Sequence, residues 1–148
     1  MKYNDAEELL ASLHRWQVYL FHGKVMTPQP HYQVILNDDF NETWEMIYIS
    51  VATSKVEERE NYIKFRNLSK ETLVIIEQWE VAFFPKRCCF NCNDVKTCNI
   101  YQLYWEYLDN RFTYVWELSK DIIEKILNWI KESLLVSDYD KNAIWLSN

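Results

Sequence analysis

The sequence predicts an α+β domain, in which a small antiparallel β-barrel of about five strands carries an N-terminal helix and two C-terminal helices. Two observations lead to this expectation. Strand-like patterns gather in the middle of the chain, and helical periodicity is confined to its two ends, so strands and helices do not alternate as they do in a parallel sheet. The chain has 148 residues, 49% of them hydrophobic, which suits one domain with a real core. We therefore expect a single domain over residues 1–148.

The N-terminal segment has the pattern of an amphipathic helix. Asn4 followed by Glu7 is typical of a capping box, in which a side chain and a backbone amide cap each other. Apolar residues then recur at steps of four, three and four: Leu9, Leu13, Trp16 and Leu20. This pattern predicts a helix over about residues 5–18, within a helical extension at residues 1–20.

The middle of the chain predicts the strands of the barrel, which we place within residues 21–95. The expected strands are residues 31–37, 45–53, 61–65, 72–78 and about 87–91. Residues 45–53 are nearly all apolar, which is typical of a strand buried on both faces. Five short antiparallel strands avoid open edges most easily by curling into a small barrel, and an SH3-like barrel is the expected form.

The C-terminal part is expected to be helical over residues 96–136, followed by a terminal segment at residues 137–148. Asn99 is a good N-cap for a helix whose apolar stripe is Ile100, Leu103, Tyr104, Tyr107 and Leu108. Ser119 begins a longer helix with Ile122, Ile123, Ile126, Leu127 and Ile130 on one face.

Composition excludes several classes of function. The single glycine, Gly23, rules out the glycine-rich loops that bind nucleoside triphosphates or dinucleotides. A net charge of −6 and a pI near 5.1 exclude a strongly basic nucleic-acid-binding surface, so RNA binding would need a local positive patch. No stretch is long and apolar enough to span a membrane, and the N-terminus lacks the apolar core of an export signal. We expect a cytoplasmic protein that does not enter the membrane.

Aromatic residues make up 16% of the chain, with seven Trp and ten Tyr, more than a core of this size easily hides. Either some of them meet a protein partner, or they are scattered singly over the surface.

All four cysteines lie within one short segment, as Cys88, Cys89, Cys92 and Cys98. Without an export signal we expect reduced thiols rather than disulfides. The spacing allows two interpretations, buried thiols or a zinc knuckle. Neither a second C-x-x-C pair nor a histidine pair lies nearby, and adjacent cysteines on a strand point to opposite faces. Buried thiols are therefore favoured, and we expect neither a metal nor another cofactor.

Four segments resemble the MazF/PemK-like ribonuclease toxins and their small-barrel relatives. They are HGKV (22–25), PHYQVILN (30–37), the strand IYISVATSK (47–55), and FPKRCCFNCNDVKTCNI (84–100). The tail LSKDIIEKILNWIKESLLV is similar to the last helix of many such proteins. The resemblance covers roughly residues 20–136, and the N-terminal helix has no counterpart in the compact members.

The resemblance implies a toxin of a toxin–antitoxin pair, which cleaves single-stranded RNA without a metal ion. In such chemistry the 2′-hydroxyl of the RNA attacks the adjacent phosphorus, so the protein must move protons and stabilise the negative charge that develops. The resemblance also implies a homodimer that is silenced by a small antitoxin protein.

The family pairs an arginine at the start of the second segment with a threonine or serine at the end of the third. Thr53 matches the second position, with Ser54 beside it. The arginine position falls on Gln29, Pro30 or His31, so this chain departs from the family pattern. A glutamine cannot replace the charged fork of arginine, whereas a histidine can exchange a proton near neutral pH.

These matches give the expected site. We expect His31, Thr53 and Ser54 to be catalytic, and Gln29, Lys24, Lys55, Lys64 and Arg87 to bind substrate. Residues 55–61 are expected to form a loop beside the RNA groove.

Ordinary structural roles explain several of the same residues. Thr53 and Ser54 can end a strand by hydrogen bonding to their own backbone. His31 can be an exposed or structural histidine, and residues 55–61 can be a solvated loop. The alternative function is a non-catalytic protein-binding module on the same barrel, and zinc-dependent folding through the cysteines is a third possibility.

Overall fold

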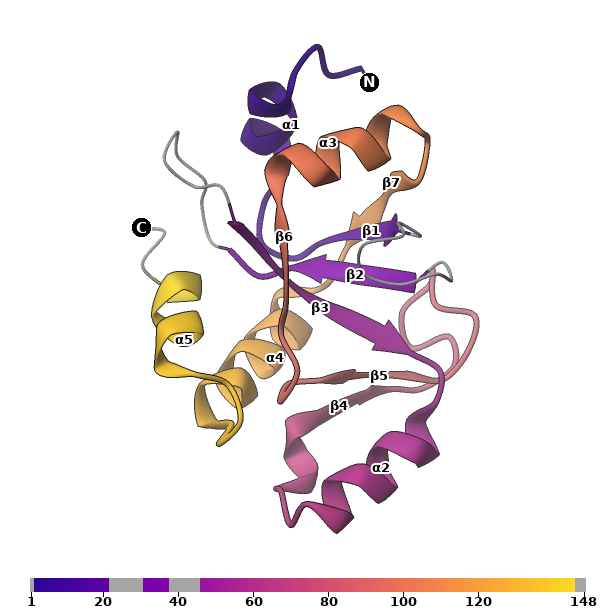
Figure 1. Ribbon diagram of the computed structural model, residues 1–148. Helices are drawn as coiled ribbons and strands as arrows, with labels where there is room; N and C mark the ends of the chain where they lie inside the picture. The colour runs from indigo at the N-terminus through magenta and orange to yellow at the C-terminus, as the bar shows by residue number, and fades with distance from the viewer. Residues whose placement is uncertain (1, 22–30, 38–45, 146–148) are drawn as a thin grey trace.

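The computed structural model describes residues 2–21, 31–37 and 46–145. Over these ranges the chain forms an α+β fold of five α-helices, one short 3-10 helix (η1) and seven strands (Figure 1). In chain order they are α1 Ala6–Ser12, β1 Gln17–Phe21, β2 His31–Ile35, β3 Met46–Thr53, α2 Val56–Phe65, η1 Lys70–Thr72, β4 Leu73–Ile76, β5 Cys88–Asn91, β6 Lys96–Asn99, α3 Ile100–Leu108, β7 Phe112–Glu117, α4 Lys120–Glu132 and α5 Asp138–Trp145.

All seven strands belong to one antiparallel sheet with the order β4-β5-β3-β2-β1-β7, and β6 also pairs with β3. Strand β3 is central. It pairs with β2 along one edge, and with β6 and then β5 along the other. The segment between β5 and β6 bends sharply, so β5 runs across the direction of β6 (Figure 1).

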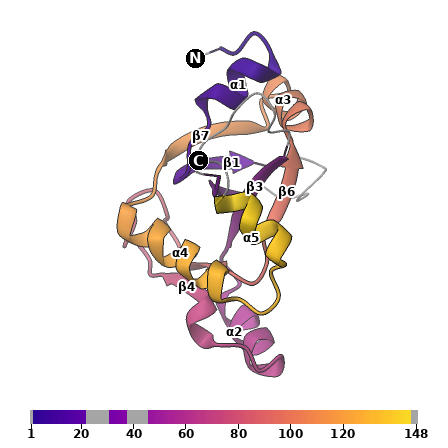
Figure 2. The ribbon, with the colours of Figure 1, turned by 90° about the vertical axis from the view of Figure 1, so that its left-hand side faces the viewer.

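The expected closed barrel is not found, because the described strands form an open sheet. The outermost strands, β4 and β7, pair with β5 and β1 but not with each other. Figure 2 shows the sheet curling around α4, which lies between β7 and β4. Ile123, Ile126 and Ile130 of α4 join a core cluster that holds Val18 of β1 and Val74 of β4. The helix therefore covers the apolar interior between the two outer strands.

Helices cover both faces of the sheet. The cluster beneath α4 also includes Ile144 of α5. On the other face, α1 and α3 pack over a second cluster that contains Ile35, Ile49 and Phe112. The helix α2 covers the far end of that second face, where Val56 and Ile63 pack with Leu73 and Cys89.

Two of the predicted helix starts are confirmed, and one is wrong. The side chain of Asn99 accepts a hydrogen bond from the amide of Tyr101, and that of Ser119 accepts one from Ile122, so both are N-caps. In the first helix the N-cap is Asp5, not Asn4. That helix ends at Ser12 rather than near residue 18, because the apolar run that follows is used for β1.

Three further expectations are corrected. Residues 56–65 form the helix α2, not a loop followed by a strand. Two strands, β6 and β7, lie within the expected helical tail. With β1 they join the four expected strands that form, so the described sheet has seven strands. The terminal segment contains a helix, α5, which the sequence did not predict. None of the helices in the described ranges is long and apolar enough to cross a membrane.

Candidate functional site

His31 and Thr53 lie at neighbouring ends of β2 and β3. Strand β2 pairs with β3 through Gln33–Val51, Val34–Ser50 and Ile35–Ile49. His31, the first residue of β2, and Thr53, the last residue of β3, each lie two residues beyond the Gln33–Val51 pair. Side chains alternate along a strand, and His31 and Thr53 are each four residues from Ile35 or Ile49, so both point to the face that carries α1, α2 and α3. Both residues are partly exposed.

The orientation of the His31 ring follows from its contact with β3. Its Nδ1 atom lies 3.3 Å from the carbonyl oxygen of Ala52, the residue before Thr53. A carbonyl oxygen can only accept a hydrogen bond, so this contact requires the hydrogen of the neutral ring to be on Nδ1. The Nε2 atom then keeps its lone pair and can accept a proton from a substrate.

Thr53 makes the local backbone contact that a strand terminus favours. Its Oγ1 atom accepts a hydrogen bond of 3.2 Å from the amide of Lys55. The hydroxyl keeps its own hydrogen for donation to another group. The structural role and the catalytic role are therefore compatible in this geometry.

The chain turns directly from Thr53 into the helix α2. Lys55 is the N-cap residue of this helix, and its side chain makes no capping hydrogen bond. The first amides of a helix lack partners within it and carry partial positive charge, so this end favours negative groups. Glu57 and Glu58 lie in the first turn, and their negative charges offset part of the positive charge at this end of the helix. Ser54 and Lys55 are exposed beside it.

Two arginines lie near the strand position that pairs with Thr53, which is Cys89 of β5. Burial raises the pKa of the Cys89 thiol to about 11, while the charges of Arg59 and Arg87 act in the opposite direction. One of these arginines belongs to α2 and the other lies just before β5. Glu60 is also close enough to raise the pKa of that thiol, so the local charge is mixed.

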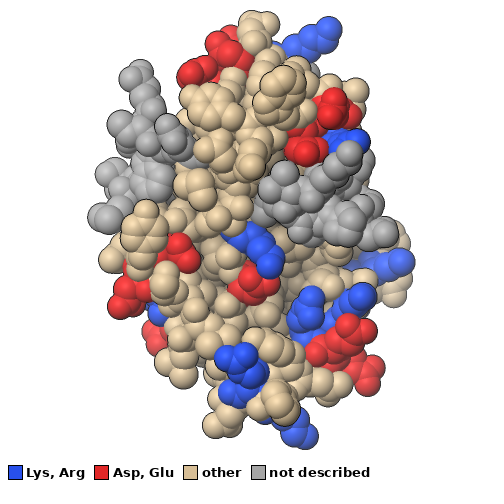
Figure 3. All heavy atoms as spheres, viewed as in Figure 1, with Lys and Arg blue, Asp and Glu red and all other residues tan. Residues whose placement is uncertain are grey.

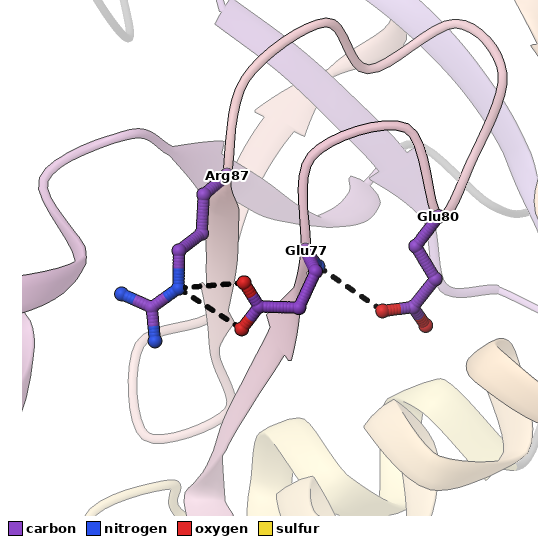
Figure 4. Close-up of polar contacts among 3 residues, drawn as sticks. All are labelled: Glu77, Glu80 and Arg87. Atoms are coloured by element: carbon purple, nitrogen blue, oxygen red, sulfur yellow. Dashed lines mark hydrogen bonds and ion pairs between the residues drawn. The ribbon is translucent and has the colours of Figure 1, made fainter.

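Arg87 is held by a carboxylate. Its Nε atom lies 3.0 Å from each carboxylate oxygen of Glu77, as Figure 4 shows. The amide of Glu77 in turn donates to the carboxylate of Glu80 at 3.0 Å. The two terminal nitrogens of Arg87 point away from Glu77 in this view, so they can still bind an anion (Figure 4).

The structure separates some residues that the sequence grouped together. Lys64 lies in the last turn of α2, nine residues beyond Lys55 and hence roughly 13 Å along the helix. It lines a different groove, together with Lys70 and Lys125. Gln29 and Lys24 lie outside the described residues.

Sequence reasoning did not select Arg59, because residues 55–61 were expected to form a loop. The helix α2 places Arg59 in its first turns, partly buried and near Cys89. The helix could have been recognised from Val56 and Ile63, which lie seven residues apart and therefore share one buried face of a helix.

The cysteines do not converge on one point. Cys88 and Cys92 belong to the core under α4, Cys98 to the core under α1 and α3, and Cys89 to the core under α2. In the part of the chain that the structure describes, no group of three or more His, Cys, Asp or Glu side chains is arranged to hold a metal ion.

The described residues on the face shown in Figure 3 form no broad basic patch. Figure 3 shows Lys and Arg side chains beside Asp and Glu over the same face of the molecule. Positive charge for an RNA substrate would therefore come from a few local groups rather than from the whole face.

Neither a protein-family model nor a curated protein matches the chain.

Proposed function

We propose that the protein is a metal-independent endoribonuclease of the toxin type, which cleaves single-stranded RNA in the cytoplasm. The observation that supports the proposal is the contact of the His31 ring, at the start of β2, with the carbonyl of Ala52, the residue before Thr53 at the end of β3. The sequence resemblance to MazF/PemK-like toxins supplies the class of reaction. A closed SH3-like barrel is not required, since β2 and β3 pair in the open sheet.

The residues fit the steps of such a cleavage. The Nε2 atom of His31 removes the proton from the 2′-hydroxyl, and the 2′-oxygen attacks the adjacent phosphorus. The bond from phosphorus to the 5′-oxygen breaks, and this oxygen takes a proton from solvent, which reaches the exposed residues Ser54 and Lys55 beside Thr53. The products are a 2′,3′-cyclic phosphate and a 5′-hydroxyl.

The negative charge that develops on the phosphorane must be stabilised by hydrogen-bond donors and positive groups beside Thr53. The hydroxyl of Thr53 can donate to a non-bridging oxygen, and Lys55, Arg59 and Arg87 supply positive charge around it. In this proposal Arg59 and Arg87 together take the role of the arginine that the family has at the start of the second segment.

The test is cleavage of a labelled single-stranded RNA in the presence of a chelator. The proposal predicts fragments that end in a cyclic phosphate, and no cleavage of the same oligonucleotide with 2′-deoxy sugars. Intact RNA after long incubation with excess protein, in several sequence contexts, would contradict it.

The resemblance also implies a homodimer and a small antitoxin partner. The mass of the purified protein in solution tests the first. A small protein encoded beside the gene, which co-purifies with the chain and stops cleavage, is the expected partner.

A second candidate function, a non-catalytic protein-binding module, is favoured by one surface. Tyr101, Trp105 and Leu108 lie at helical spacing on α3, and they are 51%, 68% and 49% exposed. Such a stripe is typical of a helix face that packs against another protein. If this is the whole function, the protein binds a partner through α3 and leaves RNA intact in every buffer.

A further inference from the structure

A large groove on the described part of the protein is lined by neither His31 nor Thr53. It has a volume of about 1010 Å³ and runs between the N-terminal segment, β1, the end of α3 and β7. Pockets for small ligands commonly have volumes of about 300–1,000 Å³. The groove is therefore large enough for a nucleotide, and it shares only Leu108 with the exposed stripe of α3.

Aromatic rings form two sides of the groove. On the sheet side, Tyr19 stacks on Phe112 with ring centres 4.1 Å apart, and Tyr114 meets Tyr19 edge-on at 5.6 Å. Tyr114 is 44% exposed, so its ring remains accessible. On the helical side, Tyr3 and Tyr107 meet edge to face at 5.2 Å, and the amide of Tyr3 donates to the Tyr107 hydroxyl. These contacts fix the rings before a ligand arrives.

A buried amide lies in the wall of the groove. Gln17 lines the groove and is only 9% exposed. Its Oε1 atom accepts hydrogen bonds from the amide of His14 and the hydroxyl of Tyr19. These two bonds fix which end of the amide is oxygen. The NH2 group makes no hydrogen bond to the described residues, so it can donate to a ligand in the groove.

The charge of the groove differs from that of the whole protein. The chain has 22 acidic residues, yet none of the described residues that line the groove is acidic. Its ionisable lining includes Lys2 and His14, both exposed. The carboxylate of Glu117 acts on Tyr114 from outside the lining.

We propose that this groove binds a nucleotide. The base lies against Tyr114 and accepts a hydrogen bond from the Gln17 amide, and the phosphate lies toward Lys2. Aromatic rings provide stacking for any base, a buried donor fixes the base edge, and a lining without carboxylates tolerates the phosphate. Single-stranded RNA and a free nucleotide present this same chemistry.

Nucleotide binding in the groove does not depend on RNA cleavage, so it can be measured with the His31→Ala variant. Calorimetry gives the affinities for adenosine, AMP and a six-nucleotide oligoadenylate. Saturable binding of AMP is expected, with weaker binding of adenosine. If the oligoadenylate binds at least ten-fold more tightly than AMP, the natural ligand is RNA; equal or tighter binding of AMP identifies a free nucleotide. No saturable binding of any of the three up to millimolar concentration would overturn the proposal.

Variants locate the ligand. Tyr114→Ala removes a stacking ring and is expected to weaken AMP binding by at least ten-fold, whereas Tyr139→Ala, which removes an exposed ring on α5, leaves it unchanged. Gln17→Glu keeps the accepting oxygen and the shape of the side chain but replaces the donor with a second acceptor, so a similar loss is expected.

Two charge changes test the position of the phosphate. Lys2→Ala should weaken AMP binding several-fold and leave adenosine binding unchanged. Glu117→Gln should tighten AMP binding a few-fold. Wild-type affinity in both Tyr114→Ala and Gln17→Glu, with folding confirmed by circular dichroism, would overturn the proposal even if RNA cleavage is found elsewhere on the protein.

Discussion

The Nδ1 atom of His31 lies 3.3 Å from the carbonyl oxygen of Ala52, so the first residue of β2 is oriented by the end of β3. This contact links the imidazole to the strand that ends in Thr53. It gives the proposed general base a defined hydrogen position and leaves Nε2 available to substrate.

The hydroxyl of Thr53 is the first target for mutation. Thr53→Val removes the proposed donor to the phosphorane and should lower the rate constant of RNA cleavage by about 100-fold, the scale found when one such donor is lost. Thr53→Ser should retain most of the activity. Thr97→Ala, which changes an exposed threonine on β6, is the matched control and should cleave at the wild-type rate. Equal rates for Thr53→Val and the control would contradict a role for the hydroxyl.

Arg59 is predicted to supply the positive charge that the toxin family obtains from an arginine at the start of the second segment. Arg59→Ala should reduce cleavage by about 10- to 100-fold, since a preorganised positive group stabilises the transition state more than the substrate. Arg66→Ala is the control, because Arg66 is the C-cap residue of the same helix and lies over the ring of Tyr62. Single-turnover rates for both variants make the comparison. If the two substitutions have the same effect, Arg59 has no special role.

Many of the helices and strands could be predicted from the sequence, because their capping residues and apolar patterns match the way these elements pack in the fold. The caps at Asn99 and Ser119 and the apolar strand β3 are examples. Helix α2 was missed because its surface is mostly polar and only Val56 and Ile63 are buried. Strand β7 was missed because four of its six residues are exposed, as expected for an outer strand with little apolar alternation.

The candidate site was predictable only in part. The contact of His31 with the end of β3 depends on the register of β2 with β3, which the two apolar strands favour but do not fix. The position of Arg59 depends on α2 and on a strand pair, β3 with β5, that lies far apart in the sequence. The groove lined by Tyr3, Tyr107 and Tyr114 combines residues from 2–19 and 107–114, so no local pattern could reveal it.

A buried polar network is expected to stabilise the bend between β5 and β6. The side chain of Asn93 donates to the Thr72 hydroxyl and accepts from the Ser133 hydroxyl, both at 2.7 Å. Asn93→Ala should lower the free energy of unfolding by about 2–3 kcal/mol, because buried hydroxyls lose a partner. Urea denaturation measures the change, and Asn61→Ala, at an exposed position on α2, should cost far less. A loss below 1 kcal/mol would show that the network contributes little.

The thiols are predicted to be unreactive in the folded protein. Burial raises the pKa of Cys88, Cys92 and Cys98 to about 12 and that of Cys89 to about 11, from an ordinary value of 9.0. A thiol reagent at pH 8 should therefore modify none of the four until the protein is denatured. A thiol that reacts in the native protein at the rate of free cysteine would contradict this burial.

The same shifts predict a loss of stability at alkaline pH. Unfolded thiols release their protons near pH 9, whereas the folded thiols keep them until about pH 11 to 12. The unfolded state then binds fewer protons than the folded state, so the free energy of unfolding falls as pH rises through this window. Denaturation midpoints measured at pH 7 and pH 10 should show the decrease, and replacing Cys92 with Ala should make it smaller.

The most direct test of the site is a double-mutant cycle on RNA cleavage in chelator, with His31→Ala, Thr53→Ala and the double variant. If the two residues act as one unit, each single substitution should lower the rate by at least about 100-fold, and the double variant should be little slower than the slower single variant. A double variant that cleaves RNA at the wild-type rate would show that these residues do not form the active site.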